Sequence, residues 1–368
     1  MRIAVVAPDL TILGGQSVQA RALMRGLQSE GHEILFVPIN PGFLPGTRWL
    51  RRYRFVRTAA NQAHYLPSLL RLRRADLVHV FSASYWSFLL APLPAVIAAR
   101  ALGKRVVLNY HSGEAPDHLA RWGLLVHPWL RLVDEIVVPS EFLRAVFARY
   151  GYETRVIRNI VDTSRFGFRE RRPLRPRLLS TRNLDRYYRV DNTLEAFARV
   201  KARCPEATLT VAGYGPEEDR LRRLAASLAV EGIRFIGRVE PEAMPGLYDG
   251  ADIFLNSSVL DNQPVSVLEA FAAGLPVVST GVGDLAGLVR DGETGLLVPP
   301  GDPGAMADAV LALLGSQDRA AAIARRARSE AERYTWEHVR HEWAAVYSGR
   351  GGARQAGGPR PGTQEPSV

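Results

Sequence analysis

Short apolar runs alternate with longer amphipathic stretches along most of the 368-residue chain. The apolar runs predict strands that are buried on both faces, and the stretches with helical spacing predict helices that cover them. In the first half, we expect strands at 3–7, 34–38, 77–81, 106–109 and 135–139, and a helix at 16–29. Strands that alternate with helices are typical of parallel α/β sheets.

The second half repeats this pattern after an Arg- and Pro-rich segment at 162–177, which has the composition of a linker. Strands are expected at 177–180, 208–212, 233–236, 252–255 and 276–279, and helices at 193–203, 217–229, 265–273, 302–314 and 318–332. We therefore expect an α/β protein with two Rossmann-like, doubly wound parallel-sheet domains, 1–165 and 166–333, that face a cleft. A helix at 334–348 is expected to cross back to the first domain, and 349–368 to form a disordered tail.

The composition fits a soluble globular protein, with 47% hydrophobic and 23% charged residues. The single cysteine, Cys204, excludes an intramolecular disulfide and a thiolate zinc cluster. The longest apolar stretch, 86–99, contains two prolines and is too short to span a bilayer. Since no secretory signal opens the sequence, we expect a cytoplasmic protein, or one that rests peripherally on a membrane.

The positive charge lies entirely in the first half of the sequence. Residues 1–165 contain 21 Lys and Arg against 11 Asp and Glu, which equals the net charge of +10, whereas 166–368 contain 26 of each. Eight arginines lie among aromatic residues between Thr47 and Arg74 and predict basic surface helices. One hypothesis is that Arg48 to Arg74 meets an anionic membrane surface or acceptor; the alternative is a solvated basic face. We expect no nucleic-acid partner.

The stretch 252–280 carries the clearest chemistry. An expected strand leads into Asp261, Asn262, Gln263 and Pro264, and a helix begins at Val265. The start of a helix presents N–H groups and a positive dipole end, which suit a diphosphate. Glu269 lies about one turn further along, where a carboxylate can bind the hydroxyls of a ribose. The alternative is an ordinary capped helix with a buried Leu-Ala face.

This stretch resembles a known family. Asp261-x7-Glu269, followed by Ala-Phe-Ala-Ala-Gly-Leu-Pro-Val-Val, is similar to the E-x7-E element of the retaining GT-B glycosyltransferases of family 4. Further similar elements are Gly14-Gly15, Gly31-His32-Glu33, Val156-Ile157-Arg158-Asn159, Gly213-Tyr214-Gly215-Pro216 and the GETGLLVP sequence at 292–299. The resemblance implies an enzyme that moves a sugar from a nucleotide-sugar, held by the second domain, to an acceptor bound mainly by the first.

The resemblance also implies roles for individual residues. Glu269 matches the acid that holds the ribose hydroxyls, and Asp261 matches the acid near the donor sugar. His111 matches a histidine that faces that sugar from the first domain. The donor site further includes Gly14, Gly15, Gly213 and the loop and helix start made by Asn262, Gln263, Pro264, Val265 and Ser266. The family needs neither a metal nor another cofactor for this reaction, so we expect none here.

Two positions depart from the family pattern. The family's G-R-L-x3-K-G element supplies an Arg and a Lys to the diphosphate. Here Arg182 keeps the Arg, whereas the Lys position falls at Tyr188 when one inserted residue is allowed. The adjacent Arg189 could substitute for the Lys, although its planar fork is not equivalent to an ammonium group. The acid of the family's G-G-x-x-E segment is replaced by Gly287.

Several motifs are absent from the sequence. No D-x-D supports a metal-carrying GT-A transferase, no G-x-G-x-x-G follows the first strand, and no G-x4-G-K-[ST] supports a P-loop kinase. The leading hypothesis is a metal-independent, retaining glycosyltransferase that acts on a glycan, a lipid-linked acceptor or another anionic acceptor. The alternatives are a non-catalytic nucleotide- or glycan-binding paralogue and a GT-B-type nucleotide-sugar epimerase.

Overall fold

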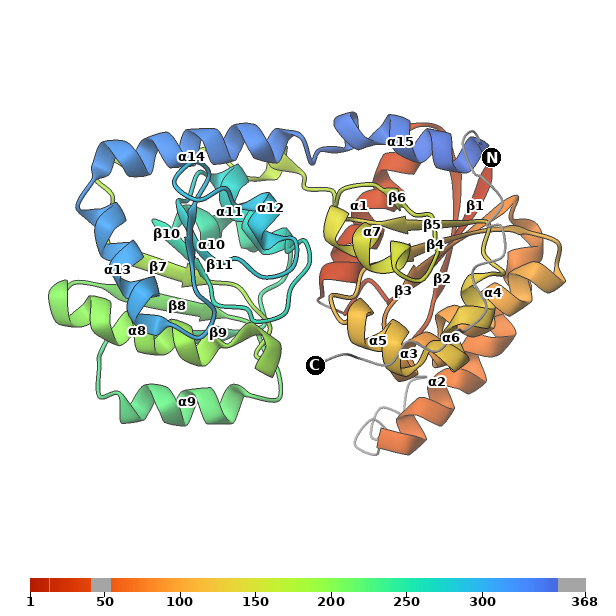
Figure 1. Ribbon diagram of the computed structural model, residues 1–368, viewed down its shortest axis with the longest axis horizontal. Helices are drawn as coiled ribbons and strands as arrows, with labels where there is room; N and C mark the ends of the chain where they lie inside the picture. The colour runs from red at the N-terminus through yellow and green to blue at the C-terminus, as the bar shows by residue number, and fades with distance from the viewer. Residues whose placement is uncertain (13, 41–53, 350–368) are drawn as a thin grey trace. The chain divides into compact units, whose positions relative to one another are not determined.

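The computed structural model describes residues 1–12, 14–40 and 54–349 (Figure 1). The chain divides into two compact units, one built from Met1–Ile12, Gln16–Arg158 and the residues from Arg340 on, and one built largely from Asn159–Val339. Each unit contains a six-stranded, fully parallel sheet flanked by helices. The expected α/β fold with two doubly wound sheets is confirmed.

The first sheet has the strand order β2-β1-β3-β4-β5-β6. Its strands are β1 (Arg2–Ala7), β2 (Glu33–Pro38), β3 (Leu77–Ser82), β4 (Arg105–Tyr110), β5 (Glu135–Val138) and β6 (Arg155–Val156). Its helices are α1 (Gly15–Ser29), α2 (Arg54–Ser68), the 3-10 helix η2 (Leu69–Arg74), α3 (Tyr85–Leu90), α4 (Pro92–Ala101), α5 (Ala115–Arg121), α6 (Gly123–Leu130) and α7 (Glu141–Ala148).

The second sheet has the order β12-β11-β10-β7-β8-β9. Its strands are β7 (Arg177–Ser180), β8 (Thr208–Ala212), β9 (Ile233–Gly237), β10 (Ile253–Asn256), β11 (Val277–Thr280) and β12 (Leu296–Val298). The helical elements are η3 (Thr163–Arg165), η4 (Arg186–Tyr188), α8 (Val190–Arg203), α9 (Glu218–Ser227), α10 (Met244–Asp249), α11 (Val265–Ala273), α12 (Leu285–Leu288), α13 (Pro303–Leu314) and α14 (Gln317–Glu332).

Alternate residues of each central strand in the second sheet enter two different hydrophobic cores. In β10, Ile253 and Leu255 join the core beneath α8 and α13, whereas Phe254 joins the core beneath α11 and α14. Both faces of the strand are thus buried, which explains why the sequence shows continuous apolar runs with no period of two. The predicted polar site residues Arg182 and Asp261 lie in the loops that follow β7 and β10.

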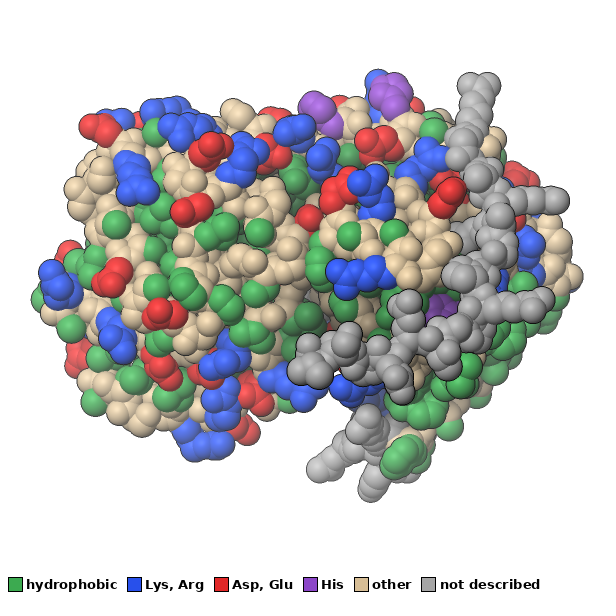
Figure 2. All heavy atoms as spheres, in the orientation of Figure 1, with side chains coloured by type: hydrophobic (Ala, Val, Ile, Leu, Met, Phe, Trp, Pro, Cys, Tyr) green, Lys and Arg blue, Asp and Glu red, His purple; other side chains and the backbone are tan. Residues whose placement is uncertain are grey.

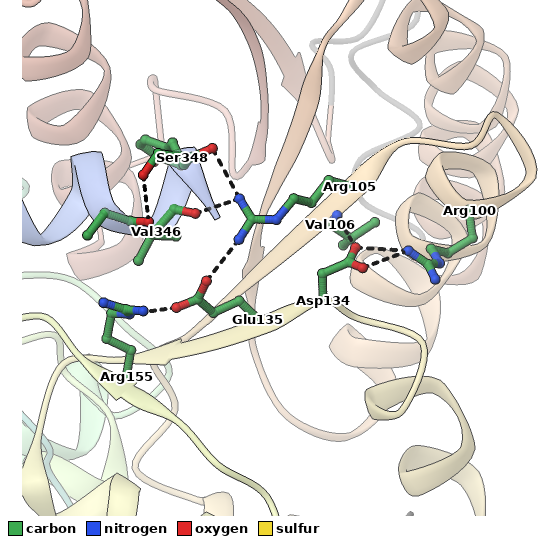
Figure 3. A network of polar contacts seen from close by, with 10 residues as sticks. Arg100, Arg105, Val106, Asp134, Glu135, Arg155, Val346 and Ser348 are labelled. Atoms are coloured by element: carbon green, nitrogen blue, oxygen red, sulfur yellow. Dashed lines mark hydrogen bonds and ion pairs between the residues drawn. The ribbon is translucent and has the colours of Figure 1, made fainter. Parts of the chain in front are cut away.

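Helix α15 (Trp336–Ser348) belongs to the first unit from Arg340 on. Arg105 on β4 donates from Nη1 to the carbonyl of Val346 at 2.5 Å and from Nη2 to Glu135 at 3.0 Å (Figure 3). Glu135 also accepts from Arg155 Nε at 2.6 Å. The buried carboxylate of Glu135 therefore joins the strands β4, β5 and β6, and Arg105 connects them to the last described helix.

The structure adds elements that the sequence pattern did not predict. These are the helices α3, α4, α5 and α6 of the first unit. The sequence pattern did not reveal them because all four are short and because α4, α5 and α6 contain proline. The linker-like segment is firmly held, since the buried Arg171 donates to the carbonyls of Tyr248, Ala251 and Ala273. The basic region forms α2 and η2 over 54–74, whereas 47–53 and, apart from Gly349, the expected tail lie outside the described residues.

Candidate active site

The second sheet changes its direction of winding between β7 and β10. From β7 the chain proceeds outward to β8 and β9 and then returns to place β10 on the other side of β7. At such a switch point the loops that follow two adjacent strands diverge and leave room for a ligand beyond their carboxyl ends. Arg182 follows β7 and Asp261 follows β10, so the topology alone brings these two predicted residues together.

The two side chains form a buried ion pair. Arg182 Nη2 donates to Asp261 Oδ2 at 2.5 Å, and Arg182 Nη1 donates to the hydroxyl of Ser266 at 2.8 Å. Asp261 Oδ2 also accepts from the Ser258 hydroxyl at 3.0 Å. Because Arg182 is only 8% exposed, this cluster concentrates one positive and one negative charge in a region of reduced dielectric.

Two glycines allow the loops to approach this closely. A Cβ on Gly213, where φ is +150°, would lie 2.1 Å from the carbonyl oxygen of Arg182. A Cβ on Gly283, where φ is +57°, would lie 2.0 Å from the carbonyl oxygen of Asp261. Gly213 was predicted from its motif, whereas Gly283 was not; its signal in the sequence is its place in the short loop that follows the apolar strand β11. Both positions require glycine because of backbone contact.

The loop before α11 is fixed by its own polar side chains. Gln263 accepts from the backbone N–H of Asn159 at 2.6 Å through Oε1, and its carbonyl accepts from the Asn159 side chain at 2.7 Å. Asn262 donates its backbone N–H to Asp261 Oδ1 at 3.0 Å. The side chain of Gln263 is thus structural, and its part in ligand binding would be to hold the loop.

Helix α11 begins directly after Pro264, whose extended backbone caps the helix. The carbonyl of Pro264 accepts from the N–H of Val267 at 3.2 Å, so that N–H is used within the turn. The N–H groups of Val265 and Ser266 belong to the first turn, which has no acceptors inside the helix. They face the end of the helix where the dipole favours an anion.

Glu269 lies one turn further along α11 and is held by a tyrosine that the sequence did not indicate. The Tyr248 hydroxyl donates to Glu269 Oε2 at 2.9 Å and lies 2.8 Å from Thr181 Oγ1. Burial raises the pKa of the Glu269 carboxyl to about 7, while this hydrogen bond and the charge of Arg165 lower it in part. The group is therefore poised between a neutral acid and a carboxylate near neutral pH.

Tyr188 is the last residue of η4, and Arg189 lies between η4 and α8. The guanidinium of Arg189 donates to Asp191 at 3.0 Å and to Asn192 Oδ1 at 3.1 Å, which holds it to the start of α8. Tyr188 instead places its ring under Arg182, whose Cζ lies 4.2 Å from the ring centroid. The residue next to the guanidinium of Arg182 is therefore Tyr188, which the resemblance places at the lysine position of the family.

His111 follows β4 in the first unit. Its ring stacks on Phe81, with a centroid distance of 5.3 Å and an interplanar angle of 16°. Burial lowers the pKa of His111 to about 4, so the ring is neutral at physiological pH. It can exchange hydrogen bonds with a sugar hydroxyl but supplies no positive charge.

Gly14 and Gly15 lie at the turn between β1 and α1. Among the residues that the structure describes, none comes within 4 Å of a Cβ built on either glycine. The packing of the chain itself therefore does not explain their small size, which leaves room for a ligand or for backbone contact with one.

The described residues form neither a metal-binding cluster nor a membrane-spanning helix. Within residues 1–12, 14–40 and 54–349, no three His, Cys, Asp or Glu side chains gather into a group that could hold a metal ion. No helix in this part of the chain is both long and apolar enough to cross a membrane.

Comparison with known proteins gives matches to both halves of the chain. The model for glycosyl transferases group 1 matches residues 175–316, and that for glycosyltransferase family 4 matches residues 13–165. Glycogen synthase from Mycobacterium tuberculosis is 32% identical over 302 residues, which cover 77% of this chain and 71% of that protein. A GDP-mannose-dependent alpha-(1-6)-phosphatidylinositol monomannoside mannosyltransferase from Mycolicibacterium smegmatis is 30% identical, over 74% of this chain and 78% of its own length.

A solved structure matches the chain over nearly its full length. HepE from Anabaena, in complex with UDP-glucose, has a TM-score of 0.74 at 17% identity and covers 95% of this chain and 100% of its own. At this identity the match concerns the fold.

Proposed function

Because the chain belongs to glycosyltransferase family 4 and has the GT-B fold, we propose that it transfers a sugar with retention of anomeric configuration and without a metal. The family establishes that the chain is a glycosyltransferase with a nucleotide-sugar donor. What we propose concerns the stereochemistry of the reaction, its independence from a metal and the kind of acceptor. The observation that carries the proposal is the buried cluster of Arg182, Asp261 and Ser266 at the switch point of the second sheet.

In the proposed reaction, the oxygen of an acceptor hydroxyl bonds to the anomeric carbon on the face from which the diphosphate leaves. The bond from that carbon to the phosphate oxygen breaks, and the acceptor's proton passes to the departing diphosphate. Negative charge grows on the diphosphate, and Arg182 and the first N–H groups of α11 are the groups that would stabilise it. No side chain is required to form a covalent intermediate.

The other predicted residues position the donor. Glu269 would accept hydrogen bonds from the ribose hydroxyls, and Asp261 would contact the donor sugar. His111, being neutral, would offer a hydrogen bond without attracting the diphosphate. Since Arg182 and a helix dipole supply positive charge to the diphosphate, we propose that no divalent cation is needed.

The test is acceptor-dependent release of nucleoside diphosphate from a panel of UDP- and GDP-sugars, with and without EDTA. We expect release that requires the acceptor and is unchanged by EDTA, with a product of the same anomeric configuration as the donor. Interconversion of donor sugars without acceptor would indicate an epimerase, and binding without turnover would indicate a non-catalytic paralogue. Loss of activity in EDTA would contradict metal independence.

We further propose that the protein rests on the cytoplasmic face of a membrane and uses a lipid-linked or otherwise anionic acceptor. One relative in the comparison carries phosphatidylinositol in its name, which supports a lipid acceptor. In the described part of the chain, α2 and η2 expose Phe55 (86%) and Leu70 (67%) in the segment that contains Arg57 and Arg71. Arginine stems beside exposed apolar side chains suit the headgroup region of a bilayer.

A second group of exposed apolar residues belongs to α3 and α6. Trp86 is 66% exposed and packs edge-on against Trp122 at 5.3 Å, and Leu124, close by in sequence, is 93% exposed. Figure 2 shows hydrophobic side chains gathered over this region of the first unit. Exposed apolar surface of this kind marks interaction sites. A lipid surface would remove the exposed apolar residues of α2 and η2, and those of α3 and α6, from water.

A further inference from the structure

The position of Tyr188 is the clearest departure of this chain from its family, and the structure shows what the tyrosine does there. Its aromatic ring lies under the guanidinium of Arg182, with Cζ 4.2 Å from the centroid. At this distance a cation and an aromatic face attract each other. A lysine at the same position would repel Arg182, so the exchange replaces repulsion between two cations by attraction.

Tyr188 is held both through its ring and through the backbone around it. It packs against the hydrophobic core beneath α8 and α13. Its carbonyl accepts a hydrogen bond from the buried hydroxyl of Ser257, just after β10, at 3.0 Å. The carbonyl of Tyr187 accepts from the backbone N–H of Val259 at 2.8 Å. These contacts join the loop after β7 to the loop after β10. The ring is therefore a fixed support for the arginine above it.

Arg182 has one polar atom that the protein leaves unsatisfied. Nη1 and Nη2 donate to Ser266 and Asp261, whereas the buried Nε has no hydrogen-bond partner among the described residues. A buried N–H of a charged group without an acceptor is costly, and a ligand oxygen would remove that cost. Because the guanidinium is planar, the ring beneath it determines the direction in which the Nε–H points.

We propose that Tyr188 is a positioning residue of the donor site, which orients Arg182 so that its guanidinium binds an oxygen of the nucleoside diphosphate. The inference rests on the proposed function and deepens it. The family's lysine would add a second charge to the diphosphate site, whereas Tyr188 acts only through Arg182. The contributions of Tyr188 and Arg182 to diphosphate binding should then be strongly non-additive.

The test compares binding of UDP, GDP and the corresponding nucleosides by calorimetry. We expect Tyr188→Leu to weaken diphosphate binding roughly 3- to 30-fold, the range that corresponds to loss of a cation–π contact, and to leave nucleoside binding unchanged. Tyr188→Phe keeps the ring and should bind as the wild type does. A general structural defect would weaken nucleosides and diphosphates alike, which would overturn the inference.

A double-mutant cycle completes the test. In an Arg182→Ala background, Tyr188→Leu should cause no further loss; equal losses in both backgrounds would contradict the proposal. Tyr188→Met is the second non-aromatic variant if Tyr188→Leu does not fold, as judged by thermal unfolding. A wild-type chain that bound neither UDP nor GDP would overturn the proposed function and this inference together, whereas normal binding by both non-aromatic variants would overturn the inference alone.

Discussion

At the scale of single residues, Glu269 has the most distinctive chemistry. Its carboxyl is buried in a helix that is apolar on most sides, and its hydrogen bond to Tyr248 only partly offsets the cost of burying a charge. Its pKa is therefore raised to about 7. Whether Glu269 accepts hydrogen bonds from a ligand then depends on pH in the physiological range.

We predict that Glu269→Ala weakens nucleotide binding by about 1.5–3 kcal/mol, the range for hydrogen bonds to a charged group. In the wild type, binding should strengthen as pH rises through about 7, because the deprotonated carboxylate is the better acceptor. Glu269→Gln is the control, since the diphosphate titrates equally in both proteins and their difference isolates the carboxyl. Equal affinity of free nucleoside diphosphate for Glu269→Ala and wild type would contradict the ribose assignment.

The same group makes a prediction about stability. A carboxyl whose pKa is higher in the folded protein than in the unfolded chain stabilises the fold most at low pH, and this contribution is lost as pH rises. Between pH 4.5 and about 7 the wild type should therefore lose stability relative to Glu269→Gln. Thermal unfolding of both proteins across this range measures the difference; parallel curves would show that the pKa is not raised.

Arg182 and Asp261 should differ in what their loss affects. Arg182→Ala should reduce turnover by roughly 10²-fold or more, as when a charge-stabilising donor is removed from an active site. Asp261→Ala should reduce turnover more than nucleotide affinity, because its proposed contact is to the sugar.

Arg189→Ala tests whether Arg189 replaces the lysine of the family. Since Asp191 and Asn192 hold the guanidinium of Arg189, we expect a smaller loss of turnover than for Arg182→Ala. An equal loss would assign Arg189 to the donor site.

At the scale of elements, the loops after β7, β8, β10 and β11 are packed against one another. Gly283 at the end of β11 is packed against the carbonyl of Asp261, and Gly213 at the end of β8 is packed against that of Arg182. The ion pair thus depends on backbone contacts from two further strands.

We predict that Gly283→Ala lowers the free energy of unfolding by about 1–3 kcal/mol, because alanine is strained at a φ of +57° and its Cβ would overlap the Asp261 carbonyl. Turnover should fall as well, since the loop that carries Asp261 must move. Gly281→Ala is the matched control in the same segment: its Cβ would find its nearest neighbour at 3.6 Å. Chemical denaturation measures the free energy of unfolding of both variants, and steady-state kinetics measures their turnover. Equal stability and turnover of Gly283→Ala and Gly281→Ala would contradict the role given to Gly283.

The elements also show what the sequence can predict. Long apolar strands such as β1 and β4, and the helix α11 with its Gly274 end, are visible because their patterns are regular. Helices α3 to α6 are short, and α4, α5 and α6 contain proline, so the sequence does not distinguish them from loops. Motifs identified Arg182 and Asp261, but Tyr248 and the ring of Tyr188 act through tertiary contacts, which no local pattern reports.

At the scale of the whole molecule, the positive charge of the first half and the exposed apolar residues of α2, α3 and α6 belong to one unit. Arg48, Arg51 and Arg52 lie outside the described residues, and of Arg54 only the backbone is described. The membrane hypothesis therefore combines a charge pattern in the sequence with apolar exposure in the structure.

We predict that the protein sediments with anionic liposomes and that binding falls as salt rises. Changing Arg48, Arg51, Arg52 and Arg54 to Gln should weaken binding at least tenfold, because each cation near such a surface contributes about 1 kcal/mol. A paired change of Leu124 and Leu125 to Ser should weaken binding to vesicles at high salt, where the apolar contribution remains. The matched control removes four exposed charges from the second unit, at Arg203, Arg223, Arg234 and Arg238. Equal recovery with neutral and anionic vesicles at low salt would contradict the hypothesis and favour a soluble acceptor.

Helix α15 has a consequence for how the protein is made. The first unit is assembled from residues at both ends of the sequence, because Arg105 on β4 binds the carbonyl of Val346, and His79 on β3 lies 2.9 Å from the Tyr347 hydroxyl. On the ribosome, the segment that supplies the first sheet emerges early, yet the residues that close it are synthesised only after the entire second unit. During that interval the second unit can fold as a continuous stretch of chain, whereas the first must wait. The order of completion during biosynthesis is thus the reverse of the order of translation.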